Sequence, residues 1–227
     1  MTHITKHLED LKQRICNAAS AAGRSENEVS ILAVSKHHPV EAIRAATTAG
    51  LVDIGENYLQ EALAKIPQFG DEITWHFIGR IQSNKTREIS RNFQWVQTID
   101  NERAARRLSE QRPAHLGALN VCIQVCTDSN HEHGGVQPEA TAALCRFIEE
   151  QPALKLRGLM TIPLPTNTPE QQRIPFKLLR ELRDELVTQG HTLDTLSMGM
   201  TADLEVAIAE GSTMIRIGTA LFGPRPG

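Results

Sequence analysis

The chain has 227 residues, of which 40% are hydrophobic, and its formal net charge is −3 at pH 7. A chain of this length can bury a substantial core, either as one barrel-sized domain or as two small domains. The slightly acidic balance argues against a nucleic-acid-binding surface, which is usually strongly basic, and no segment approaches the roughly 20 apolar residues of a membrane-spanning helix.

Helical and strand-like patterns alternate along the chain. The first segment, residues 2–23, has apolar residues three or four positions apart, which is the spacing of one helical face. Short apolar segments then predict eight strands, over residues 30–36, 51–55, 73–79, 95–100, 119–126, 154–160, 195–199 and 213–218. The segments between them predict helices over residues 39–50, 56–66, 83–93, 101–111, 138–151, 169–190 and 202–211. Ser83 is expected to cap the helix that it opens.

This alternation predicts the fold. Strands that are separated by helices pair in parallel through right-handed crossovers. Eight such units predict an α/β fold, a (β/α)8 TIM barrel that forms a single domain over residues 1–227. Residues 1–23 would be an extra N-terminal helix, acting as a lid or base of the barrel. An open doubly wound sheet is the alternative.

The carboxyl ends of the strands indicate where a site would lie, because barrels of this kind place their functional residues there. Lys36 ends the first strand, and Asn57 follows the second. His76 lies in the third, Met160 ends the sixth and Ser197 lies near the end of the seventh. We expect these side chains to meet at one mouth of the barrel.

The loops after the last two strands carry glycine and hydroxyl residues. The first loop contains Met200 and Thr201, and the second contains Gly218 and Thr219 just after Arg216. Glycine lets the backbone approach an oxyanion, and barrels often bind phosphate with these two loops. The pattern predicts a phosphate site. The alternative is that the glycines and threonines only close turns.

A lysine across the barrel mouth from a phosphate site indicates Schiff-base chemistry, since a partly desolvated amine can condense with an aldehyde. Pyridoxal 5′-phosphate (PLP) carries an aldehyde at one end and a phosphate at the other, so Lys36 and the two loops suit it. The alternatives for Lys36 are a surface role, or a Schiff base to a phosphorylated sugar in an aldolase-like barrel enzyme.

Cysteine and histidine usage points away from disulfides and metals. The four cysteines form no C-x-x-C pair, and the charged opening segment resembles neither a signal peptide nor an anchor, so we expect reduced thiols and a cytoplasmic location. His131 and His133 lack a cysteine or carboxylate cluster that would complete a zinc site. We expect a solvated loop there and no metal.

Several motifs together resemble the family of pyridoxal phosphate homeostasis proteins. They stand in the family's order and spacing over nearly the whole chain: AVSK (33–36), GENYLQE (55–61), WHFIGRIQSNK (75–85), LRGLM (156–160) and LSMGMTADLEVAIAEGSTMIRIGTALFG (196–223). The resemblance implies a barrel of PLP fold type III, like the N-terminal domain of alanine racemase. It also implies that PLP is the cofactor.

The resemblance further implies a role for each candidate residue. Lys36 would hold PLP as a covalent aldimine, and Arg216 would face the pyridine nitrogen. The phosphate would be held by Met200, Thr201, Gly218 and Thr219. The ring and its surroundings would be lined by Asn57, His76, Met160 and Ser197. Because arginine stays protonated, the ring would be a weaker electron sink than one paired with a carboxylate.

Two positions depart from the family pattern. Arg80 stands where members usually carry proline, which changes the charge of that loop and not the fold. In the loop after the fifth strand, Glu132 lies near the position of a usual lysine. A role for a second lysine in handing over PLP therefore does not carry over to this chain.

The expected function is a non-catalytic carrier that binds PLP reversibly, buffers it and delivers it to apo-enzymes through transient contacts. The alternative is an amino-acid racemase of the alanine racemase type, which needs an acid/base group on each face of the cofactor. Tyr58 is the only tyrosine, and no second domain follows to supply another, so the carrier is favoured. We expect a monomer with no nucleic-acid or membrane partner.

Overall fold

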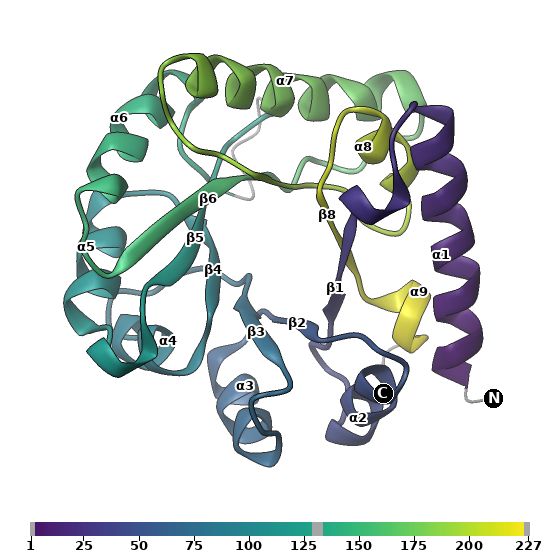
Figure 1. Cartoon of the computed structure of the whole chain (residues 1–227), viewed down its shortest axis with the longest axis horizontal. Coiled ribbons are helices and arrows are strands. Elements are labelled where there is room, and N and C mark those ends of the chain that lie inside the picture. Colours follow the sequence, from purple (N-terminus) through teal and green to yellow (C-terminus); the bar gives the residue numbers. More distant parts are fainter. Residues whose placement is uncertain (1–2, 129–133, 225–227) are drawn as a thin grey trace.

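A closed barrel of parallel strands forms the centre of the molecule in the computed structural model (Figure 1). The structure describes residues 3–128 and 134–224, and within them eight strands pair in sequence order, with β8 closing on β1. The strands are β1 Ser30–Val34, β2 Asp53–Glu56, β3 Thr74–Phe77, β4 Trp95–Ile99, β5 Leu119–Gln124, β6 Leu154–Met160, β7 Thr195–Ser197 and β8 Met214–Ile217. The predicted TIM barrel is confirmed, and the open sheet is excluded.

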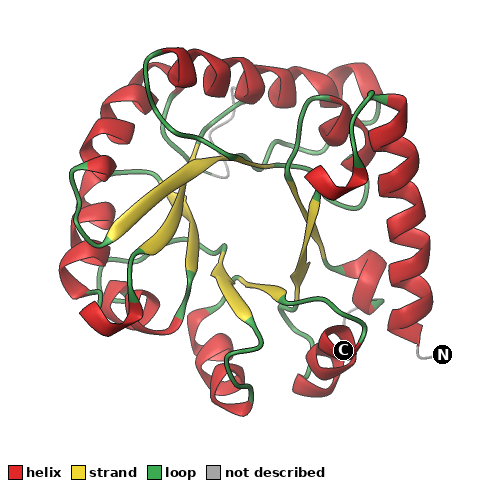
Figure 2. Ribbon diagram, in the orientation of Figure 1, coloured by secondary structure: helices red, strands yellow, loops and turns green. Residues whose placement is uncertain are grey.

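The helices form a ring outside the strands (Figure 2). They are α1 His3–Ala21, α2 Val40–Thr48, α3 Leu59–Lys65, α4 Thr86–Asn92, α5 Glu102–Gln111, α6 Pro138–Glu149, α7 Pro169–Thr188, α8 Leu204–Ala209 and α9 Thr219–Phe222. Short 3-10 helices cover Glu26–Glu28, Ile66–Gln68 and Ala114–Leu116. In the described residues no helix is long and apolar enough to cross a membrane.

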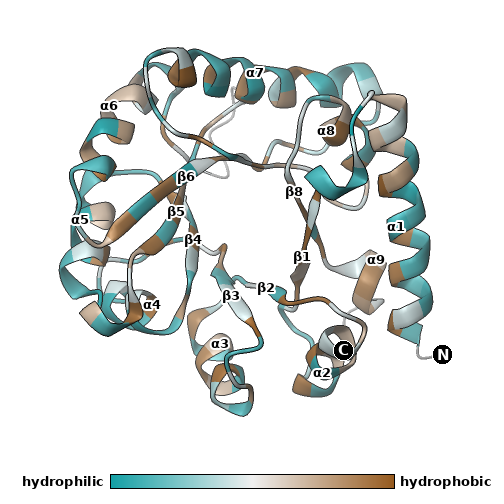
Figure 3. Cartoon of the chain, in the orientation of Figure 1, coloured by the Kyte–Doolittle hydropathy of each residue, from teal (hydrophilic) through white to brown (hydrophobic). Residues whose placement is uncertain are grey.

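Side-chain alternation along the strands separates the lumen of the barrel from its outer wall. Leu32 and Val34 of β1 cluster with Met214 of β8 and with Ile78, whereas Ala33 and Ile217 belong to the large core that the helices cover. Successive residues of a strand point to opposite faces, so the first set fills the lumen. Figure 3 shows hydrophilic residues over much of the outer helices, α1 and α7 included.

The first helix belongs to the outer ring, which corrects the expectation of a lid or base. α1 buries Ile4, Leu8, Leu11 and Ile15 and packs against α8 and α9. It runs along the outside of the barrel next to α9 (Figure 1). The physical reason is that β8 is followed only by the four-residue α9, which is too short to cover this part of the wall.

Element boundaries differ slightly from the predicted ones. Seven of the eight strands are shorter than predicted, while β6 has the predicted bounds. β5 ends at Gln124, so Cys126 lies beyond it. The helix predicted from Ser83 begins at Thr86 with Lys85 at its N-cap, so the predicted serine cap is wrong. Ser83 instead offers its backbone carbonyl to the Thr86 hydroxyl, at 3.1 Å.

Candidate functional site

The end of β1 brings Lys36 to the carboxyl mouth of the barrel. Lys36 lies two residues beyond the lumen-facing Val34, and its side chain is half-buried. The loop after β8 passes close by, because a Cβ at Gly218 would lie 3.4 Å from the carbonyl oxygen of Val34. The loop after β8 therefore lies beside the end of β1, and its contact with Lys36 stays a prediction.

Arg216 is a buried cation in the lumen, two residues beyond Met214 on β8. Its Nη1 donates to the Ser197 carbonyl at 2.6 Å and to the Ser197 Oγ at 2.9 Å. Its Nη2 donates to the Thr161 carbonyl at 2.7 Å. Burial lowers the pKa of Arg216 to about 10, which still leaves it charged at neutral pH. The adjacent strand β7 and Thr161, the residue after β6, thus fix the guanidinium.

Ser197 connects Arg216 by hydrogen bonds to residues on the opposite side of the lumen. Its Oγ donates to the Gln97 Oε1 at 2.6 Å, and the Gln97 Nε2 donates to the His76 Nδ1 at 3.0 Å. The His76 Nε2 then donates to the Asp53 Oδ1 at 3.0 Å, because a ring whose Nδ1 accepts carries its proton on Nε2. We call these residues the polar chain: Asp53, His76, Gln97, Ser197 and Arg216.

His76 and Met160 lie within the packed interior. Both ring nitrogens of His76 are used by the polar chain, and its ring stacks on Trp95 at a centroid distance of 5.1 Å. Burial lowers the pKa of His76, although the hydrogen bond to Asp53 opposes this. Met160 packs with Trp95 and Cys122. Contact of His76 or Met160 with a bound ring stays a prediction.

The loop after β7 has the close turn that its glycine predicts. Gly199 has φ of 95°, and its carbonyl accepts from the Arg216 backbone amide at 3.0 Å. The Met200 amide donates to the Asp203 Oδ1 at 2.5 Å, so a carboxylate occupies one of the donors that the sequence assigns to phosphate. Burial raises the pKa of Asp203. Arg14 of α1 binds the Thr201 carbonyl at 2.9 Å and thereby ties the helix to this loop.

The remaining candidates lie around the same mouth. Gly218 is half-buried and Thr219 is exposed where α9 begins. The Asn57 Oδ1 is buried and has no hydrogen-bond partner within the described part of the chain. A buried amide oxygen without a donor is costly, so this atom suits a bound group that supplies one. The mouth therefore offers a bound ligand one buried acceptor, the Asn57 Oδ1.

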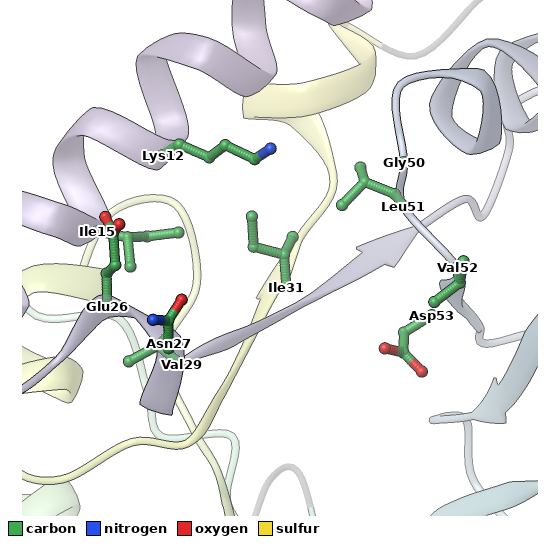
Figure 4. Close-up of a pocket in the computed structure, with 10 residues that line it drawn as sticks. All are labelled: Lys12, Ile15, Glu26, Asn27, Val29, Ile31, Gly50, Leu51, Val52 and Asp53. Carbon is green, nitrogen blue, oxygen red and sulfur yellow. The ribbon is translucent and has the colours of Figure 1, made fainter.

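A separate pocket lies at the other end of the barrel. It has a volume of about 440 Å³ and is bordered by α1, by the first 3-10 helix and by the amino ends of β1 and β2 (Figure 4). Of the five residues of the polar chain, Figure 4 labels only Asp53 at this pocket. Nothing in the sequence pattern predicts this pocket.

Sequence reasoning missed Asp53 and Gln97 of the polar chain and also Lys65, which is buried close to Lys36. A polar residue alternating with apolar ones in a strand, such as Gln97 in WVQTI, was the only available signal. In the part of the chain that is described, no group of three or more His, Cys, Asp or Glu side chains could hold a metal. His131, Glu132 and His133, including the replaced lysine position, lie outside the described residues.

Comparison with known proteins assigns the chain to a family. Residues 7–226 match the family model of the alanine racemase N-terminal domain. A protein of Pseudomonas aeruginosa named pyridoxal phosphate homeostasis protein is 52% identical over 99% of this chain and 97% of its own length. A protein of Escherichia coli K12 with the same name is 44% identical over 99% of this chain and 98% of its own.

Solved structures agree with this assignment. PipY of Synechococcus elongatus with PLP bound superimposes with a TM-score of 0.84 at 34% identity, covering 97% of this chain and all of that one (100%). Alanine racemase of Clostridium difficile gives a TM-score of 0.74 at 15% identity, covering 96% of this chain and 58% of that chain. At this lower identity the likeness to alanine racemase is one of fold.

Proposed function

The chain belongs to the pyridoxal phosphate homeostasis proteins, within the alanine racemase N-terminal domain family, and we propose that it binds PLP reversibly and takes part in PLP homeostasis. The observation that carries this proposal is the grouping of Lys36, the fixed Arg216 and the loops after β7 and β8 at one mouth of the barrel. The PLP bound to PipY, at 34% identity, supports the choice of ligand.

Lys36 would attach the cofactor. PLP would supply an aldehyde that can condense reversibly with an amine, with one water released on attachment and taken up again on release. The loop residues Thr201, Gly218 and Thr219 would hold the phosphate, together with Met200, whose amide would exchange the Asp203 carboxylate for it. The partnerless Asn57 Oδ1 would meet a donor near the ring, and Ser197, His76 and Met160 would surround it more deeply.

Arg216 favours carriage over catalysis. Bound PLP acts as an electron sink when its pyridine nitrogen is protonated. A guanidinium facing that nitrogen disfavours the extra proton, and Arg216 is held as a cation by three hydrogen bonds. We therefore propose a PLP carrier that buffers the reactive aldehyde and passes it to apo-enzymes in transient contacts. We further propose that it acts as a single-domain monomer in the cytoplasm.

An amino-acid racemase is the second candidate, because the fold is that of the alanine racemase barrel. Racemisation needs a second acid/base group opposite the lysine. Tyr58, the single tyrosine of the chain, is exposed at the start of α3. This position favours the carrier. Racemisation of alanine at ordinary enzyme rates by the purified protein would contradict it.

The decisive test is an absorption spectrum of the purified protein with added PLP, before and after borohydride, followed by peptide mass mapping. We expect a visible band that borohydride removes and a pyridoxyl mass on the peptide that contains Lys36. Lys36→Ala should lose that band and keep its fold by circular dichroism. Lys85→Ala, a lysine at the same mouth, is the control that should keep the band. Labelling of another lysine in the wild-type protein would reject the assignment.

A further inference from the structure

The turn that carries Lys36 has an unusual backbone. His37, the next residue, has φ of 64°, and it is the one non-glycine residue with positive φ in the described part of the chain. Residues other than glycine are disfavoured in this left-handed conformation, because their Cβ crowds the backbone. Surrounding contacts must therefore maintain it. The neighbouring helix α3 supplies such contacts.

Lys65, at the end of α3, is buried against this turn. Its ammonium group donates to the Ser35 carbonyl at 2.8 Å, to the Glu56 Oε1 at 2.7 Å and to the Glu61 Oε1 at 2.6 Å. A lysine ammonium has three donors, and all three are used here. We call Lys65, Glu56 and Glu61 the Lys65 cluster.

The cluster holds the backbone on both sides of Lys36. The Ser35 carbonyl, bonded to Lys65, belongs to the peptide group that precedes Lys36. The His37 amide belongs to the peptide group that follows it, and it donates to the Glu61 Oε1 at 2.6 Å. Since one lysine joins these two contacts, the two peptide planes that flank the Lys36 Cα are held by a single ionic group.

A third contact anchors the same segment to β2. The Ser35 Oγ donates to the Glu56 Oε1 at 2.6 Å, and Glu56 is fully buried. Burying an ammonium against the buried Glu56 and the partly exposed Glu61 contributes little net stability compared with apolar packing of the same volume. Stability alone therefore does not account for this arrangement, whereas its hydrogen bonds to the turn give it a specific task.

We propose that Glu61 and Lys65 are positioning residues for Lys36: they hold the turn after β1 in the conformation that directs the Lys36 amine toward the aldehyde of PLP. This inference rests on the proposed function and adds to it the residues that prepare the lysine. Neither residue needs to touch the cofactor, because each acts through the backbone of the turn.

Glu61 is the residue to change. Lys65→Met would leave the buried Glu56 carboxylate without its cation, and the protein could fail to fold. The Glu61 side chain is one-quarter exposed, so Glu61→Ala removes the acceptor of the His37 amide at lower risk. Glu61→Gln retains an oxygen at the same position and serves as the rescue. Gln60→Ala, an exposed neighbour on α3, is the matched control.

Two ligands separate positioning from general damage. PLP can bond covalently to Lys36, while pyridoxine 5′-phosphate has an alcohol in place of the aldehyde and binds only through the ring and phosphate. We expect Glu61→Ala to raise the dissociation constant of PLP by about tenfold, as for a lost hydrogen bond to a charged group, and to leave that of pyridoxine 5′-phosphate unchanged. Glu61→Gln and Gln60→Ala should remain within about twofold of the wild type for both ligands.

A measurement without any ligand completes the test. Hydrogen exchange of the His37 amide should become at least about tenfold faster in Glu61→Ala, because its acceptor is lost. An unchanged PLP affinity, or an equal loss for both ligands, would overturn the inference. If the wild-type protein itself carries no pyridoxyl label on Lys36 after borohydride reduction, the proposed function fails first, and the two failures are therefore distinguishable.

Discussion

A single strained residue lies beside the lysine that would hold the cofactor. The left-handed backbone of His37 costs about 1–2 kcal/mol relative to an ordinary conformation. Its side chain makes a tilted ring contact with the exposed Tyr58, at a centroid distance of 5.1 Å. The turn around it is held by the His37 amide on Glu61, by the Ser35 carbonyl on Lys65 and by the His38 amide, which donates to the same Ser35 carbonyl at 3.0 Å.

A pair of substitutions at this position isolates the strain. His37→Gly and His37→Ala both remove the ring contact with Tyr58, but only glycine adopts positive φ without a steric penalty. We expect His37→Ala to be less stable than His37→Gly by about 1 kcal/mol. Denaturant unfolding measured on both variants tests this. Equal free energies of unfolding would mean that the turn relaxes when the side chain is removed.

Among the elements, the loop between β7 and α8 shows the tightest packing of a glycine on a helix. Gly199 has φ of 95°, and a Cβ there would lie 2.5 Å from the Cβ of Ala207. Real Cβ atoms do not approach so closely, so any side chain would push the loop away from α8. Because Met200 and Thr201 follow directly, such a movement would also shift the proposed phosphate donors.

Gly199→Ala should therefore lower the stability of the protein more than an alanine substitution at another glycine that has the same positive φ but no close neighbour. Gly190 has φ of 100°, and a Cβ there would have no described heavy atom within 4 Å, so Gly190→Ala is the matched control. Both variants incur the left-handed penalty, and we expect Gly199→Ala to be destabilised by a further ~1–3 kcal/mol from overpacking. Its PLP affinity should fall while that of the control is retained. A smaller loss of stability than in Gly190→Ala would contradict this account.

The order of strands and helices can be predicted because it depends on local patterns. Each strand is a short apolar run between turn residues, and each main helix has an apolar face, so periodicity alone predicts all eight strands. The place of α1 cannot be predicted in this way. It depends on how much wall α9 leaves uncovered, and a sequence pattern does not reveal the length of a four-residue helix.

Some residues of the candidate site can be predicted from sequence order, and others depend on contacts between distant parts of the chain. Lys36 and the loops after β7 and β8 can be predicted, because the end of a strand in a barrel is a place that sequence order defines. Lys65 cannot, since it reads as a solvated helix position, and its burial comes from contacts with Ser35, 30 positions away. Gln97 is equally hidden, because its partner Ser197 is 100 positions away.

At the scale of the whole molecule, the polar chain joins the two ends of the barrel. Asp53 lies at the amino end and borders the pocket there (Figure 4), with a side chain that is 30% exposed. The buried Arg216 lies toward the carboxyl mouth. Three neutral side chains separate this anion from this cation, and each passes on a hydrogen bond. The arrangement requires His76 to stay neutral, with its proton on Nε2.

This requirement makes the stability of the protein depend on pH. An unfolded chain binds a proton at histidine with a pKa of about 6.5. Burial lowers the pKa of His76 in the folded state. As the pH falls below about 6.5, the unfolded state therefore binds more protons than the folded one. The free energy of unfolding must therefore fall as the pH falls through the unfolded value. For one histidine the loss between about pH 7.5 and about pH 5.5 is at most about 1.4 kcal/mol, a limit reached when the folded-state pKa lies well below this range.

His76→Gln removes this titration and keeps a donor for Asp53. We expect the variant to be less stable than the wild type near neutral pH, because the Gln97 amide and the stacking on Trp95 lose their partner. Its free energy of unfolding should nevertheless fall less than that of the wild type between the two pH values, by at most about 1.4 kcal/mol. His115→Gln, at an exposed position, should retain the wild-type slope. If His76→Gln retains it as well, His76 accepts its proton in the folded state, and the neutral polar chain is not the state that the barrel maintains.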